Sequence, residues 1–342
     1  MKRREILKAL SALVVTAALP ARAETRATVM TVTGPIAAAE MGLTLPHEHV
    51  VANFQAYADW AKAPAPYDRD DVVATALPYL VRIRDLGCRT FVDPTGAFLG
   101  RDPFVLKALA ERSGLHILMA TGNYAADHNR HLPPWVYDEP AEALARRWVA
   151  EFTGGIDGSG VRAGFIKLSF DGGPLNAVEQ KLVKAAALAH LETGMTIGVH
   201  TGGPGAAQSA AEQQAILTAS GVHPSARIWI HAQNEPDLSH QIEAARAGTW
   251  IEFDGVAPDT LDHHLDLVTR LRDEGLLSQV LVSQDAGWYH VGAPGGGAFR
   301  GYDLIFTGFI PGLKARGFTD AEIATVFVSN PAKAFALKKR AL

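Results

Sequence analysis

The chain has 342 residues, of which 48% are hydrophobic and 20% are charged, a composition that excludes a largely disordered chain and is typical of a globular protein with a sizeable core. The formal net charge is −4, and because residues 1–23 contribute +4, the rest of the chain carries −8. A protein this acidic is not expected to bind nucleic acid. Cys88 is the only cysteine, so no disulfide can form within the chain.

Residues 1–23 are predicted to be an export signal. Basic residues precede an apolar run from Ala9 to Leu19, and Ala21-Arg22-Ala23 follows as a cleavage site. The apolar run is too short to span a membrane. The Arg3-Arg4 pair resembles a twin-arginine signal, and an ordinary secretory signal is the alternative. We expect a periplasmic or secreted protein that is free of the membrane after cleavage, with a single domain over residues 24–342.

Eight short apolar runs alternate with amphipathic stretches along the rest of the chain. The runs are predicted to be strands at 43–50, 88–95, 116–124, 164–170, 195–201, 227–233, 249–255 and 280–286. Helices are predicted at 70–86, 102–113, 138–152, 176–193, 208–220, 237–247, 260–274, 302–316 and 319–336. The alternation predicts parallel strands, and eight units favour a (β/α)8 TIM barrel. An open doubly wound sheet is the alternative, but no glycine-rich dinucleotide motif follows an early strand.

The predicted strands end on polar residues, which meet at the catalytic face of such a barrel. His47 and His49 are two residues apart, so their side chains project from the same face of a strand and can share an ion. His200, His231 and Asp285 close later strands and are ligand types for divalent metals.

A binuclear site would need one further bridging ligand. Lys167 lies on the predicted fourth strand, where such a ligand belongs, but an ammonium group has no lone pair. A lysine with a depressed pKa could react with carbon dioxide to give an anionic carbamate.

Motifs in order along the chain resemble the phosphotriesterase family of the amidohydrolase superfamily. They are GPIAAAEMGLTLPHEHV, GFIKLSF, GVHTGGPGAAQSAAEQQ, IHAQNEPDLS, LVSQDAG and SNPAKAF. The resemblance implies two divalent ions, with zinc expected before manganese, cobalt or iron. Their implied ligands are His47, His49, N6-carboxylated Lys167, His200, His231 and Asp285. It also implies a metal-bridging hydroxide as the nucleophile, with Asp285 accepting its proton.

The expected substrate is a small ester or lactone. Tyr124 matches a tyrosine that family lactonases carry just past the third strand, whereas organophosphate-degrading members generally have a tryptophan-bearing segment there. An organophosphate triester is the alternative substrate. The family's usual proton relay is missing, because Asn234 replaces an aspartate and Gly255 replaces a histidine or arginine. A periplasmic metal- or ligand-binding protein with weak catalysis is therefore the alternative class, and a homodimer is left open.

Aromatic residues are expected to line the substrate pocket. Trp288, Tyr289 and His290 begin a long glycine-rich loop that runs to Tyr302, in a place where barrel enzymes put specificity elements. A disordered insertion is the alternative reading of this loop. Trp60, in the loop after the first strand, is expected to wall the pocket from the other side.

Two aspartates and nine histidines are less informative. Asp93 and Asp254 precede proline and glycine, so they fit ordinary turns as well as a site. The remaining histidines are expected to be surface or helix residues: His116, His128, His131, His190, His223, His240, His263, His264 and His290.

Overall fold

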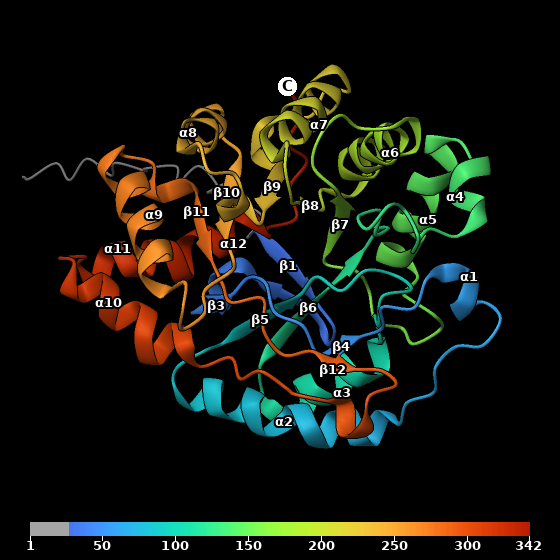
Figure 1. Cartoon of the computed structure of the whole chain (residues 1–342), viewed down its shortest axis with the longest axis horizontal. Coiled ribbons are helices and arrows are strands. Elements are labelled where there is room, and N and C mark those ends of the chain that lie inside the picture. The colour runs from blue at the N-terminus through green and yellow to red at the C-terminus, as the bar shows by residue number, and fades with distance from the viewer. Residues whose placement is uncertain (1–26) are drawn as a thin grey trace, which may run out of the picture.

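The computed structural model describes residues 27–342, so the predicted signal peptide lies outside the described residues. Eight parallel strands occupy the centre of the molecule (Figure 1). They are β3 Thr44–Leu45, β5 Thr90–Asp93, β6 His116–Thr121, β7 Phe165–Phe170, β8 Ile197–Thr201, β9 Arg227–Ile230, β10 Trp250–Phe253 and β11 Val280–Val282. Each strand pairs with the next one in this series, from β3 to β11. All eight predicted strands are therefore present, although most are shorter than predicted.

The first and last strands of this series meet through backbone hydrogen bonds just beyond their ends. The His49 amide donates to Ala286 O at 2.8 Å, and the Asp285 amide donates to His47 O at 3.1 Å. Glu48, which is fully buried, accepts hydrogen bonds from Ser283 Oγ at 2.8 Å and from the Ala286 amide at 2.7 Å. These contacts close the sheet, which confirms the predicted TIM barrel.

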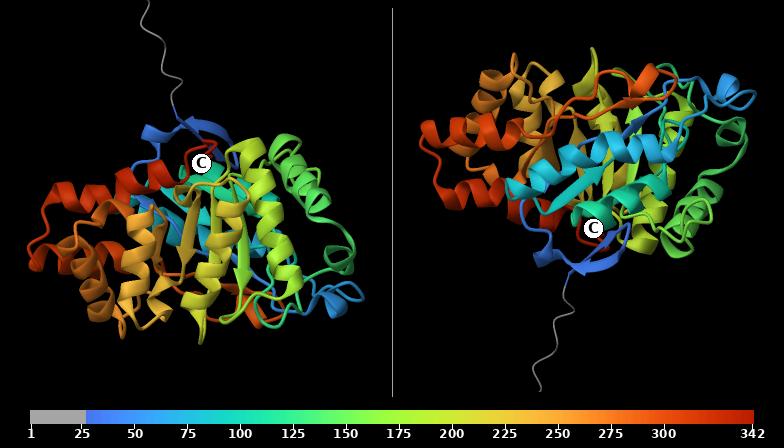
Figure 2. Two further views of the ribbon diagram at one scale, coloured as in Figure 1. Left: turned by 90° about the horizontal axis from the view of Figure 1, so that it is seen from above. Right: turned by 90° about the horizontal axis from the view of Figure 1, so that it is seen from below.

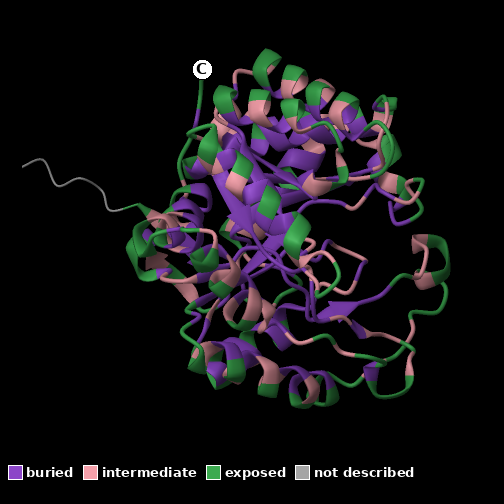
Figure 3. Ribbon diagram, turned by 60° about the vertical axis from the view of Figure 1, so that its left-hand side comes forward, coloured by how far each residue is buried: buried purple, intermediate pink, exposed green. Residues whose placement is uncertain are grey.

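Helices surround the barrel on all sides (Figures 1 and 2). The helices between strands are α2 Arg69–Asp85, α3 Pro103–Ser113, α5 Ala141–Thr153, α6 Ala177–Thr193, α7 Ala206–Ala219, α8 Leu238–Ala247 and α9 Leu261–Asp273. After β11 come a π-helical turn Ile305–Phe309, α10 Ile310–Ala315, α11 Asp320–Ala324, a second π-helical turn Thr325–Ser329 and α12 Asn330–Ala334. The strands are buried while the helices expose their outer faces, as Figure 3 shows. This burial pattern is the physical reason that the strands read as continuous apolar runs.

Local sequence explains where the helices begin and end. At α6, the Asn176 side chain accepts hydrogen bonds from the backbone at the start of the helix, and Glu179 bonds back to the Asn176 amide. Gly194 ends the same helix with φ of 78°, a left-handed conformation that glycine adopts without strain.

Six short elements were not predicted. The antiparallel hairpin of β1 Thr28–Thr31 and β2 Gly34–Ala37 lies at the same end of the molecule as the C-terminus (Figure 2). At the other end, β4 Val51–Ala52 pairs with β12 Tyr289–His290. Helices α1 Tyr57–Trp60 and α4 Pro134–Asp138 lie in loops. Within residues 27–342, none of the helices has the length and apolar character needed to cross a membrane.

Candidate metal centre

His47 and His49 follow β3 and are both buried at the carboxyl end of the barrel. Their Nε2 atoms lie 3.3 Å apart, so two potential ligand nitrogens face the same small volume. The opposite ring nitrogens are held by neighbours. His49 Nδ1 lies 2.6 Å from Thr95 Oγ1, and His47 Nδ1 lies 3.3 Å from Glu252 Oε2. Such outer contacts orient a histidine for metal binding.

Asp285 follows β11 and completes this side of the cluster. Its Oδ1 lies 3.2 Å from His49 Nε2 and 3.7 Å from His47 Nε2. That oxygen is buried and has no well-aligned hydrogen bond within the described part of the chain. Burial raises the pKa of Asp285, but nearby His49, His231 and Lys167 outweigh burial and lower the pKa overall. The lowered pKa favours the ionised carboxylate, and its Oδ1 faces the Nε2 atoms of both histidines.

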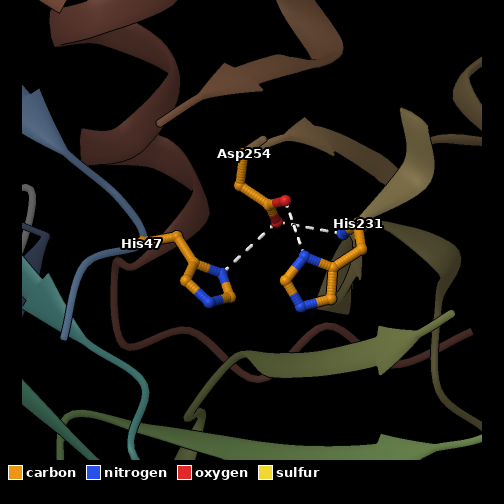
Figure 4. Close-up of side chains that lie close together, drawn as sticks. All are labelled: His47, His231 and Asp254. Carbon is orange, nitrogen blue, oxygen red and sulfur yellow. Dashed lines mark hydrogen bonds and ion pairs between the residues drawn. The ribbon is translucent and has the colours of Figure 1, made fainter. Parts of the chain in front are cut away.

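His231 ends β9 and is held by Asp254 of the following strand end. Figure 4 shows the Asp254 carboxylate between the rings of His47 and His231. Asp254 Oδ1 lies 2.6 Å from His231 Nδ1, and its Oδ2 accepts the His231 amide at 2.9 Å. Burial lowers the pKa of His231, but Asp254 outweighs this effect, so the net shift is upward. The backbone of His231 has φ of 59°, a strained conformation of the kind that clusters at functional sites.

Lys167 and His200 lie on neighbouring strands β7 and β8. The Lys167 side chain is buried, and burial lowers its pKa although Asp285 and Glu252 act in the opposite direction. A depressed pKa favours the neutral amine that carbamate formation requires. The His200 ring lies edge-on to that of His231, with 4.3 Å between centroids.

Two of the histidines, His47 and His200, favour the neutral imidazole, which is the form that binds metals. Burial lowers the pKa of His47 and of His200 well below the usual value, and neighbouring cationic groups add to this effect. Two groups of three residues within positions 27–342 place ligand atoms close enough to hold an ion. They are His47, His49 and Asp285, and His47, His231 and Asp254.

Glu252 and Asp254 are site residues that the sequence did not assign. Asp254 was left open as a turn residue, and Glu252 was not singled out. Glu252 lies on β10 and Asp254 follows the last residue of that strand, and their spacing of two places both side chains on the same face. Burial raises the pKa of Glu252 well above the usual value, and neighbouring acids add to the effect. Two acids in alternation within an apolar strand are the signal that could have identified them.

The aromatic residues expected in the substrate pocket divide into two sets. Trp288 stacks on His49, with 3.9 Å between centroids, and its Nε1 donates to Asp285 O at 2.8 Å. Exposed Phe54 lies on the outer side of Trp288 and also faces His290. Tyr124 lies 5.7 Å from the His200 ring. Trp288, His290 and Tyr124 are thus brought to the mouth of the barrel.

Tyr289 and Trp60 contact other parts of the molecule and not the histidine cluster. The Tyr289 hydroxyl donates to Asp71 of α2 at 2.5 Å, because alternation along β12 places Tyr289 and His290 on opposite sides. Trp60 packs against Tyr57 and Phe98 rather than the histidine cluster.

Two further expectations change with the structure. The loop after β11 is packed, since Arg300 and Gly287 exchange backbone hydrogen bonds and buried Tyr302 donates to His49 O at 2.7 Å. This excludes the reading of the loop as a disordered insertion. His131 was expected on the surface or in a helix, but it is buried in a turn, where its Nδ1 lies 3.0 Å from Gln55 O.

Gly255 lies close to two neighbouring side chains. A Cβ atom at this position would lie 2.8 Å from Gln233 Nε2 and 3.2 Å from His264 Nε2. Gln233 in turn donates to Asp254 Oδ1 at 2.7 Å. The space that a larger side chain would need is therefore filled by the groups that support Asp254.

The fold and this cluster define a TIM barrel with a candidate metal centre at the carboxyl ends of its strands. The chain matches the phosphotriesterase family model over residues 27–335 and belongs to that family. It is similar to the phosphotriesterase homology protein of Escherichia coli strain K12, with 28% identity over 86% of this chain and 98% of that protein.

Two other relatives have names that refer to hydrolysis. The aryldialkylphosphatase of Saccharolobus solfataricus is 28% identical over 86% of this chain and 95% of that protein. A solved structure described as organophosphate hydrolysis activity engineered from a weak promiscuous lactonase template is 30% identical. It covers 90% of this chain and 100% of its own, with a TM-score of 0.80. Family and relatives together indicate a hydrolase.

Proposed function

We propose that this protein is a binuclear-metal hydrolase that cleaves a small ester or lactone. The observation that carries the proposal is the convergence of His47, His49, His231 and Asp285 at one end of the barrel, beside buried Lys167. Burying several polar and ionisable groups of these types together costs free energy unless they are paired or bind an ion.

The residues present fit divalent ions. Asp285 Oδ1 is buried without a well-aligned hydrogen bond in the described chain, and the Nε2 atoms of His47 and His49 face each other at 3.3 Å. His47, His49 and Asp285 would hold one ion. His200 and His231 would hold the second, and Lys167, as a carbamate, would contact both. Imidazole and carboxylate together suit zinc, and also manganese, cobalt or iron.

Two divalent ions would supply a hydroxide nucleophile at neutral pH, shared between them, and a Lewis acid for the substrate oxygen. The protein itself would contribute three things. Asp285, whose lowered pKa favours the ionised form, would accept a proton. Asp254 fixes the orientation of the His231 ring. Trp288 covers His49 and keeps water from that side of the site.

Tyr124 and Trp288 favour an ester or lactone with an apolar substituent. Burial raises the pKa of the Tyr124 hydroxyl, so that the group stays a neutral hydrogen-bond donor next to His200. Trp288 and exposed Phe54 form an apolar rim on the opposite side. An organophosphate triester is the second candidate. It is favoured by the named activity of the Saccharolobus solfataricus relative and would use the same ligands.

A panel of substrates tests the choice between an ester or lactone and an organophosphate triester. The purified protein, loaded with zinc or manganese, would be assayed for kcat/KM on lactones, aryl esters and a diethyl aryl phosphate. We expect a lactone or ester to exceed the triester by at least about tenfold, which corresponds to about 1.4 kcal/mol of transition-state stabilisation. A triester that wins by the same factor would reverse the substrate choice. No turnover of any activated substrate by metal-loaded protein would instead favour a binding protein with weak catalysis.

We also propose export by the twin-arginine route to the periplasm, on the basis of the Arg3-Arg4 pair. Replacing both arginines with lysine should leave the precursor in the cytoplasm, as judged by cell fractionation. An unchanged periplasmic yield would contradict this route.

A further inference from the structure

The outer face of β9 buries an arginine that has no ion-pair partner in the part of the chain that the structure describes. Arg227 begins the strand and is 1% exposed, and its Nε and Nη2 atoms have no hydrogen-bond partner within residues 27–342. Trp229 lies on the same face, and its indole Nε1 is also buried without a partner. Ile228 and Ile230 alternate with them and pack inside the barrel. Three buried donors thus point into the layer between strand and helices with no acceptor.

Arg227 and Trp229 line a cavity of about 570 Å³ between α7 and α8. The walls of this cavity, the α7–α8 groove, consist largely of short apolar side chains. They include Ala207, Ala211 and Ala215 of α7, and Ala244 and Ala247 of α8. Larger side chains at these positions would fill the space over the strand. The alanines instead leave an open groove that has Arg227 and Trp229 among its lining residues.

The electrostatic setting of Arg227 is unfavourable as it stands. Burial lowers the pKa of Arg227 to about 9, and the group still carries its charge at neutral pH. Glu243 and His240 also line the groove but lie exposed at its mouth. The Trp229 ring, whose centroid lies 5.8 Å from Arg227 Cζ, gives this charge an aromatic contact but no anion. A buried charge without an anionic partner destabilises a fold, so a ligand that supplies an anion here would be stabilising.

We propose that the α7–α8 groove is a second binding site, distinct from the histidine cluster, for an organic carboxylate with an apolar body. The Nε and Nη2 atoms of an arginine form the fork that binds a carboxylate through two parallel hydrogen bonds. The alanine walls would contact the hydrocarbon part. A compact inorganic anion would leave these walls in contact with water. The site does not depend on the proposed hydrolysis, since Arg227 lies at the opposite end of β9 from His231.

Calorimetric titration of the metal-loaded protein with octanoate tests the proposal, with 1-octanol as the uncharged control of equal length and inorganic phosphate as the compact anion. We expect octanoate to bind at least about tenfold more tightly than either control, because only octanoate offers both an anion and an apolar chain. Octanol binding as tightly as octanoate, or no octanoate binding at millimolar concentration, would overturn the proposal. In the second case water alone would satisfy the buried donors.

Two variants separate this site from the histidine cluster, where a carboxylate could also bind. Arg227→Met removes the charge and keeps the side-chain length. Ala215→Leu fills the groove from an exposed helix position and leaves Arg227 in place, so it serves even if the first variant does not fold. Ala150→Leu, on the exposed side of α5, is the matched control. We expect octanoate affinity to fall at least about tenfold in both groove variants and to stay unchanged in the control.

Equal octanoate affinity in all three variants would place the binding elsewhere and overturn the proposal. Sedimentation of the same proteins adds a second check. If the unmodified protein is a dimer that Ala215→Leu dissociates, the groove is covered by a second copy of the chain and the carboxylate proposal fails.

Discussion

The two ends of β9 bury ionisable groups in opposite ways. At the carboxyl end, His231 lies 2.6 Å from a carboxylate oxygen of Asp254, which itself accepts a hydrogen bond from Gln233. At the amino end, Arg227 is equally buried, but two of its donors have no partner in the described chain. A buried polar group is tolerated when its neighbours satisfy it and costs stability when they do not. The first arrangement fixes the orientation of the His231 ring, whereas the second leaves two donors of Arg227 without an acceptor in the described chain.

The largest expected effect is at Lys167. If Lys167 contacts both ions as proposed, replacing it with alanine should lower kcat/KM by about a thousandfold or more, equivalent to about 4 kcal/mol. Metal analysis of the variant should show fewer than two ions per chain. Adding a short carboxylic acid should restore part of the activity, since it can take the place of the carbamate. Full activity in the variant would contradict a role for Lys167 in the site.

A variant of Asp254 tests the carboxyl end of β9, where the buried His231 has a hydrogen-bond partner. Asp254→Asn should weaken metal binding by about 10- to 100-fold, because the neutral amide no longer holds the protonated side of the His231 ring as strongly. The affinity would be measured by competition with a chelator. Asp259→Asn, at an exposed position nearby in the chain, is the matched control and should bind metal as the unmodified protein does. Equal affinity in the two variants would mean that His231 needs no support from Asp254.

A variant of Glu48 tests whether the closure of the barrel between β3 and β11 depends on this buried, hydrogen-bonded acid. Glu48→Gln should lower the free energy of unfolding by about 2 kcal/mol, because one carboxylate oxygen that accepts from Ser283 or Ala286 is replaced by a donor. Urea denaturation would measure the change. Glu142→Gln, exposed on α5, should leave the midpoint in place. A midpoint unchanged in both variants would show that the backbone hydrogen bonds close the barrel without Glu48.

A variant of Trp288 tests whether this ring positions His49 or contacts the substrate. Trp288→Ala removes the ring stacked on His49 and should lower kcat/KM by about tenfold, or about 1.4 kcal/mol. A fall in kcat would indicate that the ring positions His49, whereas a rise in KM would indicate contact with substrate. Phe54→Ala, on the outer side of Trp288, should change KM alone. No change in either constant for Trp288→Ala would remove the residue from the site.

The smallest effect is expected at the amino end of β9, where two donors of Arg227 lack a partner in the described chain. Arg227→Met should leave the free energy of unfolding within about 1 kcal/mol of the unmodified value or raise it, because an unpaired buried charge is lost and an apolar chain of similar length remains. Chemical denaturation without added carboxylate would measure it. A loss of several kcal/mol would show that Arg227 is already paired in solution, and the contrast between the two ends of β9 would disappear.

The amino-acid sequence by itself determined the strands and indicated the polar residues near their ends. Apolar runs bounded by helices predicted all eight barrel strands, because a strand buried on both faces must be apolar along its length. The spacing of His47 and His49 predicted a shared face, and that is where their Nε2 atoms meet. Such local periodicity is encoded in the order of residues and needs no tertiary contact to be read.

Only the tertiary structure decided the contacts between distant segments. Asp254 reads as a turn residue in the sequence, and its role depends on the approach of His231 from the neighbouring strand. Tyr289 and Trp288 are adjacent in the chain, yet one contacts α2 and the other stacks on His49. Arg227 reads as the polar start of a strand, and its burial follows from helices α7 and α8 closing over it. Burial and partners are properties of the packed chain, so no local pattern could have predicted them.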